Sequence, residues 1–173
     1  LYNSAGEMVD SFSPGYPTQR DGYSFGVLPG TQEKVFFTTP TPGSANEIFR
    51  SFTQFLDVHV GFDVPRGIYE GQGPLSVVLS ATAPGVEIRY TRGFTTPTWE
   101  KVEVYQTPIE VNANSTLRAV ALKEGFGPSW VETHSYFLTL TPEQKSLPIM
   151  AVVTDPSHLD GPDGIRNPAN VQF

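Results

Sequence analysis

Residues 75–91 read LSVVLSATAPGVEIRYT, and this stretch decides the fold class of the chain. Apolar residues stand at every second position over 75–81 and again over 86–90. A period of two with one apolar side predicts two half-buried strands. Pro84 and Gly85 separate the two runs, which predicts a tight turn between the strands.

Short strands continue at a similar spacing after this stretch. They are predicted at residues 102–105, 109–111, 117–122 and 130–138, with turns at 112–114 and 125–128. Many short strands with regular turns favour a sandwich or a small barrel. We therefore expect an all-β fold: an immunoglobulin-like antiparallel β-sandwich over residues 63–138, with extra strands and loops from partial flanking modules.

The N-terminal flank also favours strands and turns. Residues 1–47 begin with a predicted hairpin over 1–12 and include an apolar run at 35–37. Over 48–62 the apolar residues recur near a helical spacing, which predicts a linker or a short helix. Because an isolated hairpin is marginal in water, we expect residues 1–47 to dock on 48–62, on the sandwich edge or on a second copy of the chain.

The C-terminal flank, residues 139–173, divides into three parts. Residues 139–146 form a polar connector, and residues 147–153 form a predicted apolar strand. Residues 155–170 are dense in Asp, Pro, Gly and Asn, which are loop-forming residues. We expect a linker followed by the beginning of another module.

The composition excludes several classes of protein. The 173 residues carry a net charge of −7 and no cluster of Lys or Arg, so nucleic acid is not an expected partner. No apolar run reaches the length of a membrane span. Cysteine is absent, which excludes disulfides and thiolate chemistry. The chain opens in mid-pattern without a Met, and we expect it to be a piece of a longer protein.

Residue types suited to catalysis do not converge in the sequence. His59, His134 and His158 lie far apart and lack the spacing of a helical zinc site. The glycine-rich residues 125–129 lack the lysine and the helix of a phosphate-binding loop, and a β-turn explains them better. We expect no catalytic residue and no cofactor.

Two weaker candidate sites remain. Asp155, Asp160 and Asp163, with Asn167 and Asn170, could line a calcium site through their oxygen atoms. Their spacing does not match the helix–loop–helix calcium pattern, and Asp and Asn beside Pro and Gly are ordinary turn residues, which is the favoured interpretation.

Aromatic residues near the predicted loops could instead stack on a sugar. Trp99, Tyr105 and Phe126 are the speculative carbohydrate-binding residues, and Trp99 is the best surface candidate because it lies in a Pro/Thr loop. We expect Trp130 to lie in or beside the core, since a sandwich of this kind commonly buries a tryptophan.

Three family resemblances follow one another along the chain. Residues 1–10, 21–26 and 41–46, the last reading TPGSAN, resemble the C-terminal half of a lamin-tail-type domain. Residues 75–81, 84–91 and 115–121 resemble the chitobiase/β-hexosaminidase C-terminal-type domain, which would cover about 64–138. That family usually has Asp-Gly after its Tyr-Thr, where this chain has residues 92–94, RGF, so any role of that Asp is lost here.

The third resemblance lies at the C-terminus. Residues 147–156 and 164–168 resemble the start of a CotH-type domain, a family of spore-coat-like atypical kinases. The resemblance implies that the kinase-like residues lie beyond this chain, and that the sandwich is an accessory module without catalytic residues.

These resemblances imply a non-catalytic structural or interaction module of a larger, secreted bacterial multidomain protein. The expected partners are the neighbouring domains of the parent chain, and the expected location is outside the cell or at its surface. A carbohydrate-binding accessory module is the alternative, with glycans or cell-surface polymers as partners. Catalysis by this chain, such as phosphoryl transfer or glycan hydrolysis, is not expected, because neither arrangement of groups can be found in the sequence.

Overall fold

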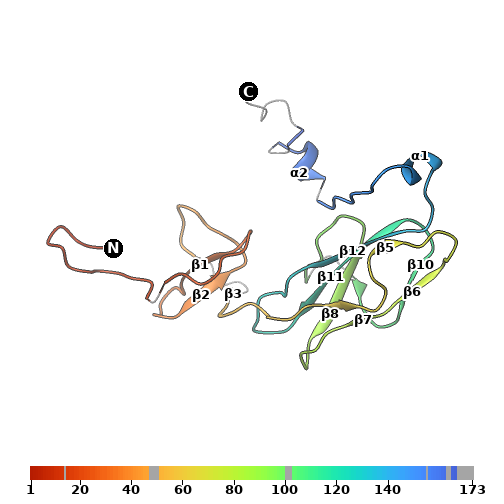
Figure 1. Cartoon of the computed structure of the whole chain (residues 1–173). Coiled ribbons are helices and arrows are strands. Elements are labelled where there is room, and N and C mark those ends of the chain that lie inside the picture. The colour runs from red at the N-terminus through yellow and green to blue at the C-terminus, as the bar shows by residue number, and fades with distance from the viewer. Residues whose placement is uncertain (14, 47–50, 100–102, 155, 163–164, 167–173) are drawn as a thin grey trace. The chain divides into compact units, whose positions relative to one another are not determined.

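The chain folds into two compact units in the computed structural model (Figure 1). The structure describes residues 1–13, 15–46, 51–99, 103–154, 156–162 and 165–166. The first unit comprises Leu1–Gln54 and the second Phe55–Phe173. Among the described residues of both units the regular structure is nearly all strand, which confirms the predicted all-β fold class.

The first unit is built on a three-stranded antiparallel sheet in the order β1-β2-β3. Its strands are β1 (Ser24–Val27), β2 (Lys34–Phe37) and β3 (Ser51–Phe52). Phe36 lies opposite both Phe25 and Phe52, so three phenylalanine rings gather on one face. The buried side chains of Val35 and Phe37 occupy the opposite face, because successive side chains of a strand alternate.

The predicted hairpin at the N-terminus is present as a short, exposed loop. Tyr2 and Met8 form an isolated antiparallel bridge. The Asn3 Oδ1 atom accepts hydrogen bonds from the backbone N–H groups of Ala5 and Glu7, both at 3.0 Å. Gly6 has a φ of 79°, which a residue without a side chain adopts at little cost.

Of the two alternatives for residues 48–62, a linker or a short helix, the helix is wrong for the part that the structure describes. Residues 51–62 contain no helix, and they contribute β3 and β4 (Gly61–Phe62) instead. Leu56, Val58 and Val60 are buried and alternate with exposed neighbours, which is the period of a strand. Residues 48–49, which contributed to the helical spacing, lie outside the described residues. Residues 1–47 are covered in part by this stretch, since β3 adds to the edge of β2.

The second unit is a sandwich whose larger layer is a five-stranded sheet in the order β5-β12-β11-β8-β9. Its strands are β5 (Gly67–Ile68), β8 (Glu87–Arg92), β9 (Glu103–Val104), β11 (Ser115–Leu122) and β12 (Glu132–Phe137). All neighbours are antiparallel except β12 and β5. The predicted strand at 102–105 begins outside the described residues and includes β9.

The smaller layer contains two short antiparallel pairs. β4 pairs with β7 (Leu79–Ser80), and β6 (Leu75–Val77) pairs with β10 (Ile109–Val111). Val78 separates β6 from β7, and its backbone N–H donates to the Asp63 carboxylate at 2.7 Å. The predicted run over 75–81 is therefore one extended segment that pairs with a different strand at each end.

The core lies between the two layers. Val77 and Val111 from the smaller layer meet Leu117, Ala119 and Tyr136 from the larger sheet, and none of these five side chains is accessible to solvent. Burying each of the larger apolar side chains stabilises the fold by about 1.5–3 kcal/mol. The apolar residues of the alternating runs in the sequence thus form one shared core between the two layers.

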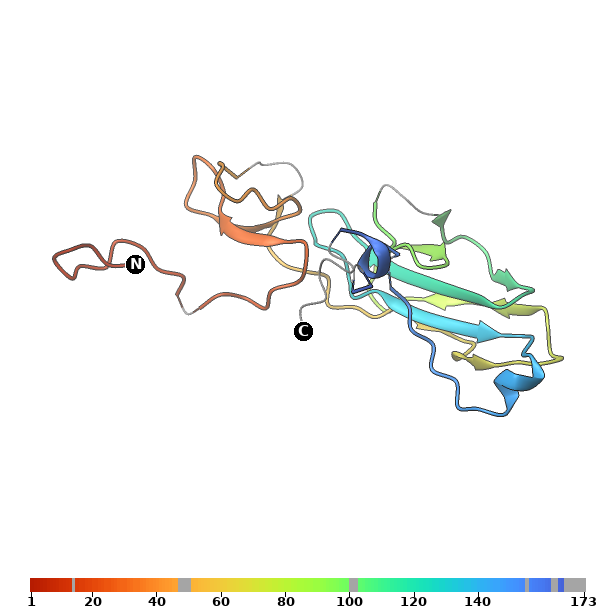
Figure 2. The same ribbon diagram turned by 90° about the horizontal axis from the view of Figure 1, so that it is seen from above.

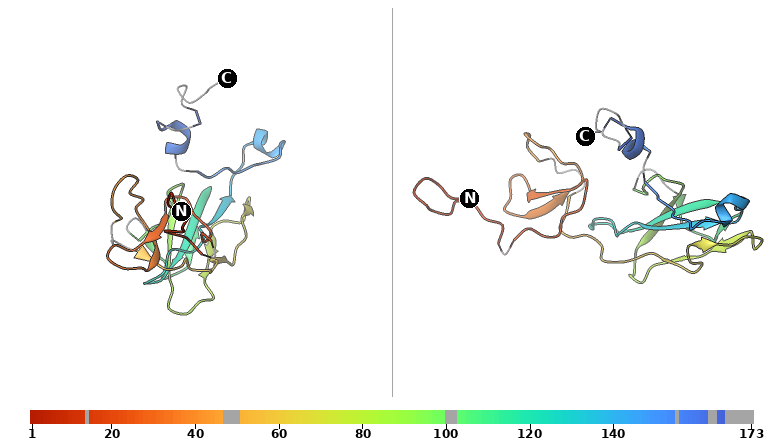
Figure 3. Two further views of the ribbon diagram at one scale, coloured as in Figure 1. Left: turned by 90° about the vertical axis from the view of Figure 1, so that its left-hand side faces the viewer. Right: turned by 45° about the horizontal axis from the view of Figure 1, so that its top comes forward.

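The C-terminal flank differs from the prediction. The connector 139–146 includes α1 (Pro142–Lys145), whose capping box joins Thr141 and Gln144, and Figure 3 shows α1 beyond the end of β12 in both views. The strand predicted over 147–153 is not formed, and the side chain of Met150 is 85% exposed. An extended segment needs a partner strand to satisfy its backbone, and none of the described strands pairs with this one. A second short helix, α2 (Ser157–Asp160), follows.

Candidate functional site

Two of the three aromatic candidates for sugar binding pack against the sandwich core. Tyr105 and Phe126 are half-buried beside the core cluster. The Tyr105 ring meets the Tyr90 ring edge-on, with 6.5 Å between centroids, and the Lys123 ammonium lies 5.5 Å from the centre of the Phe126 ring. Their rings therefore complete the core, and this placement does not favour a flat exposed surface for a sugar.

Trp99, the third candidate, belongs to a loop that is fastened onto the outer face of the sheet. Its ring lies 5.4 Å from the Arg89 guanidinium, and Arg89 Nη1 donates to the Trp99 carbonyl. Arg118 Nη1 donates to the Phe94 carbonyl at 2.6 Å and to the Thr96 hydroxyl at 2.9 Å. The loop 93–99 thus covers part of the sheet, and Trp99 is half-buried instead of standing free at the surface.

Trp130 takes the opposite position to the one predicted. Its side chain is 47% exposed, whereas a place in or beside the core was expected. Ser129 is buried in its place, and its hydroxyl accepts from the Ala121 N–H at 2.9 Å and donates to the Trp130 carbonyl at 2.8 Å. This serine fastens the segment before β12 to β11, and the neighbouring ring turns outward.

The predicted calcium site finds no support among the described residues. Asp160 forms an ion pair with Arg166 at 2.5 Å, so its carboxylate already has a cation. Asp155 and Asp163 lie outside the described residues, as do Asn167 and Asn170. In the described part of the chain, no three His, Cys, Asp or Glu side chains are grouped closely enough to hold a metal ion.

Two of the three histidines make structural contacts at the junction of the first and last strands of the sandwich, and the third, His158, lies 3.0 Å from the Thr154 hydroxyl in the C-terminal flank. His59 Nδ1 lies 2.6 Å from Glu132 Oε1 on β12. The His134 ring stacks on Phe62 with 4.0 Å between centroids. The Tyr136 hydroxyl donates to the Val64 carbonyl at 2.9 Å, which ties the same junction.

The environment of this junction shifts two pKa values. Burial lowers the pKa of His134 below its ordinary value of 6.5, and the nearby Arg66 lowers it further, while the Val64 carbonyl and Glu132 act in the opposite direction. Burial also raises the pKa of the Tyr136 hydroxyl, which therefore stays protonated and can donate. Both groups are held in their neutral forms, which suits a packed junction between strands.

We expect the sandwich to lose stability as the pH falls from about 7 to about 5, and His134 to account for part of that loss. The unfolded chain binds a proton near pH 6.5, whereas the folded chain, with its lowered pKa, resists protonation. Stability is therefore full above that range and declines as the pH falls toward the folded pKa. Urea unfolding followed by tryptophan fluorescence measures it, because both tryptophans lie in the second unit.

The control for this pH dependence is His134→Phe, which keeps a ring against Phe62 and removes the titrating group. Between pH 7 and pH 5 the urea midpoint of the original chain should fall further than that of the variant, because the variant lacks the group that titrates. Parallel pH profiles for the two proteins would contradict the role assigned to His134.

Comparison with known proteins agrees with the sandwich. The family model described as Fn3 associated, an immunoglobulin- and fibronectin-like associated domain, matches residues 77–136, from the end of β6 to near the end of β12. The comparisons with curated proteins and with solved structures gave no match to this chain. None of the helices in the described residues is long and apolar enough to cross a membrane.

Proposed function

We propose that this chain is a non-catalytic structural and interaction module, a spacer that holds neighbouring domains of a larger, secreted bacterial protein apart. The observation that carries the proposal is where the chain enters and leaves the sandwich. It enters at Phe55 and Leu56, where the Leu56 N–H donates to the Gly127 carbonyl at 2.9 Å. It leaves at Leu138 and Thr139, after β12.

The entry and the exit lie at opposite ends of β11. Gly127 belongs to the loop after Leu122, at the C-terminal end of that strand. Asn114 immediately precedes the first residue of the strand, and its Oδ1 atom accepts from the N–H groups of Leu138 and Thr139 at 2.7 and 2.9 Å. Figure 2 shows the chain entering the sandwich at one end and continuing to α1 at the other.

This geometry suits a spacer because the length of the folded sandwich separates the point where the chain enters from the point where it leaves. β11 has eight residues, which corresponds to about 25 Å between the two ends. Asn114 also donates from Nδ2 to the Thr139 carbonyl at 2.7 Å, so the side chain holds the exit by three hydrogen bonds. The match of 77–136 to an associated domain agrees with an accessory role. The resemblances to lamin-tail, chitobiase C-terminal and CotH-type domains supply the extracellular bacterial setting.

The proposal is tested by measuring the distance between the two ends in solution. The chain lacks cysteine, so Asp57→Cys and Thr139→Cys, both at exposed positions, accept one spin label each without a background signal. We expect one narrow distance distribution centred near about 25 Å. The control pair, Asp57→Cys with Glu124→Cys, places both labels at the entry end and should give a much shorter distance. A broad distribution for the first pair would contradict a rigid spacer.

Asn114→Ala should broaden that same distribution, since the exit segment loses three hydrogen bonds.

In the parent protein, exchanging residues 63–138 for an unrelated sandwich of equal end-to-end length should preserve activity, and a flexible Gly/Ser linker of equal contour length should reduce it. Equal loss of activity with both replacements would argue against a spacer and for a specific ligand of the sandwich.

A further inference from the structure

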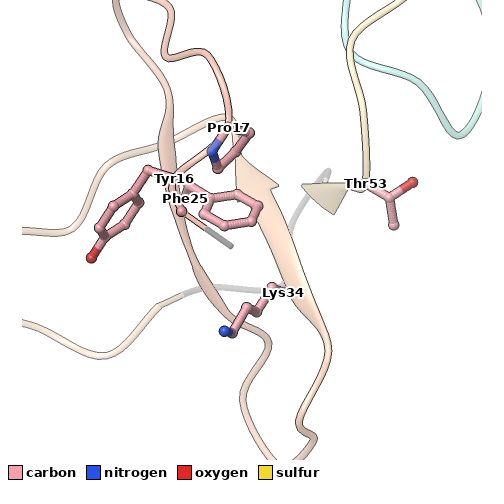
Figure 4. A pocket seen from close by; sticks show the side chains of 6 residues that line it. Tyr16, Pro17, Phe25, Lys34 and Thr53 are labelled. Carbon is pink, nitrogen blue, oxygen red and sulfur yellow. The ribbon is translucent and has the colours of Figure 1, made fainter. Parts of the chain in front are cut away.

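The first unit carries an open hollow on the aromatic face of its sheet. The hollow has a volume of about 490 Å³ and is lined by Gly15, Tyr16, Pro17, Phe25, Lys34 and Thr53. Figure 4 shows Phe25 in its middle, Tyr16 on one side and Thr53 on the other, with the Lys34 side chain below. All six residues belong to the first unit, so the hollow is independent of the sandwich.

Tyr16 is an exposed ring that the fold holds in place. Its side chain is 65% exposed, yet the ring stacks on Phe12 with 4.3 Å between centroids and meets Phe25 at 6.4 Å. Phe25 in turn packs on Phe36 at 4.8 Å, and Phe36 on Phe52 at 5.5 Å. A surface ring supported in this way loses little conformational freedom when a ligand stacks on it.

Lys34 places a positive charge beside these rings. Its Nζ atom donates to the Ser11 carbonyl at 2.7 Å and lies 4.5 Å from the centre of the Phe12 ring. Neither contact neutralises the charge, and within the described residues the ammonium has no carboxylate partner. No Asp or Glu lines the hollow. In a chain with a net charge of −7, this is a local site for an anionic group.

We propose that this hollow binds an acidic polysaccharide and holds a single uronate unit of the polymer. A pyranose ring offers a flat C–H face that can lie on the exposed Tyr16 ring. The carboxylate of a uronate is attached to the same ring, so one sugar unit reaches Tyr16 and Lys34 together. The hollow is shallow and open, which suits a polymer that extends beyond it on both sides.

A proline-rich acidic peptide is less well matched to these residues. Such peptides dock in grooves lined by several aromatic side chains along a polyproline helix. Here one exposed ring stands beside a single ammonium, which is an arrangement for one ring-shaped unit that carries one negative charge. The peptide remains an outcome that the experiment distinguishes.

The test is calorimetric titration of the full chain with a galacturonate oligomer at low salt. We expect a dissociation constant tighter than about 1 mM, weakened as salt screens the charge of Lys34. The methyl-esterified oligomer, which has the same rings without the charge, should bind about tenfold more weakly. An acidic proline-rich peptide is titrated in parallel and should not bind.

Three variants assign the binding to the hollow. Tyr16→Ala should weaken the galacturonate oligomer at least about tenfold, whereas Tyr2→Ala, which removes a tyrosine of the same unit that is 67% exposed, should change nothing. Lys34→Gln should remove the preference for the charged oligomer over its ester. Because Tyr16 and Tyr2 are both exposed, their variants should keep the fold, which circular dichroism checks. A dissociation constant weaker than about 1 mM, unchanged affinity in Tyr16→Ala, or measurable binding of the peptide would each overturn the proposal.

Discussion

Leu117→Ala should lower the free energy of unfolding of the sandwich by about 2–5 kcal/mol. Leu117 is wholly buried in β11, and it packs between the five-stranded sheet and the smaller layer. The loss combines the transfer of the removed atoms back to water with the cavity that they leave behind. Urea unfolding followed by tryptophan fluorescence measures it, because the signal comes from the second unit alone.

Leu147→Ala is the matched control for this change. Leu147 is 69% exposed in the same unit, so the same substitution should change the stability by no more than about 0.5 kcal/mol. If the Leu117 variant unfolded at the same urea concentration as the control, the sandwich core would not lie where the structure places it.

Tyr136→Ala should be the other severe change, with a loss of about 3–5 kcal/mol. The ring is fully buried in the core, and the hydroxyl ties β12 to the Val64 carbonyl at 2.9 Å. Tyr136→Phe separates the two contributions: it keeps the ring and removes the hydrogen bond, so about 1–3 kcal/mol should be lost because the partly buried carbonyl loses its short bond and keeps only the longer contact with His134 at 3.4 Å.

Tyr69→Phe is the control for the hydroxyl. The Tyr69 hydroxyl donates to the carbonyl of Pro65, four residues earlier, at 2.8 Å, but this pair is exposed. Water can replace the lost donor there, and we expect a change below about 0.5 kcal/mol. Equal losses in the two phenylalanine variants would show that burial of the Tyr136 bond has no effect on stability.

The sugar site predicted from the sequence and the hollow beside Tyr16 differ in how the tertiary structure places their aromatic rings. Trp99, Tyr105 and Phe126 were singled out because they lie near predicted loops. The fold uses Tyr105 and Phe126 to complete the core, and it fastens Trp99 to Arg89. Tyr16 was not singled out, because nothing near it in the sequence marks an exposed ring. Its support by Phe12 and Phe25 arises only when the chain folds back over the sheet.

The helix alternative for residues 48–62 was wrong over 51–62 for a different reason. The apolar residues of that stretch fit both the helical period and the strand period, because the adjacent residues Phe55 and Leu56 are compatible with either. The alternation of Leu56, Val58 and Val60 was the better guide, and it predicts the burial that the structure has. A short segment of this kind is decided by the partner that its backbone finds, and for β4 that partner is β7, about eighteen residues later.

The sequence by itself determined the fold class and the places of most strands in the sandwich. Alternation over 75–81 and 86–90 requires one apolar side, and Gly and Pro between the runs require turns, so these features follow from local chemistry. The tertiary structure alone decided which layer each strand joins. The runs on either side of Pro84 belong to opposite layers, because β8 pairs with β11 whereas β6 pairs with β10.

The exposure of the two tryptophans likewise depends on tertiary contacts. Trp99 is half-buried because Arg89 and Arg118 hold its loop on the sheet, and Trp130 is exposed because Ser129 takes the inward position beside Ala121. These partners are 8 to 24 residues distant in the sequence from the groups that they bind. The period of a strand specifies that neighbouring side chains point to opposite faces, but the residues that cover each face come from elsewhere in the chain, and their packing determines which ring is buried.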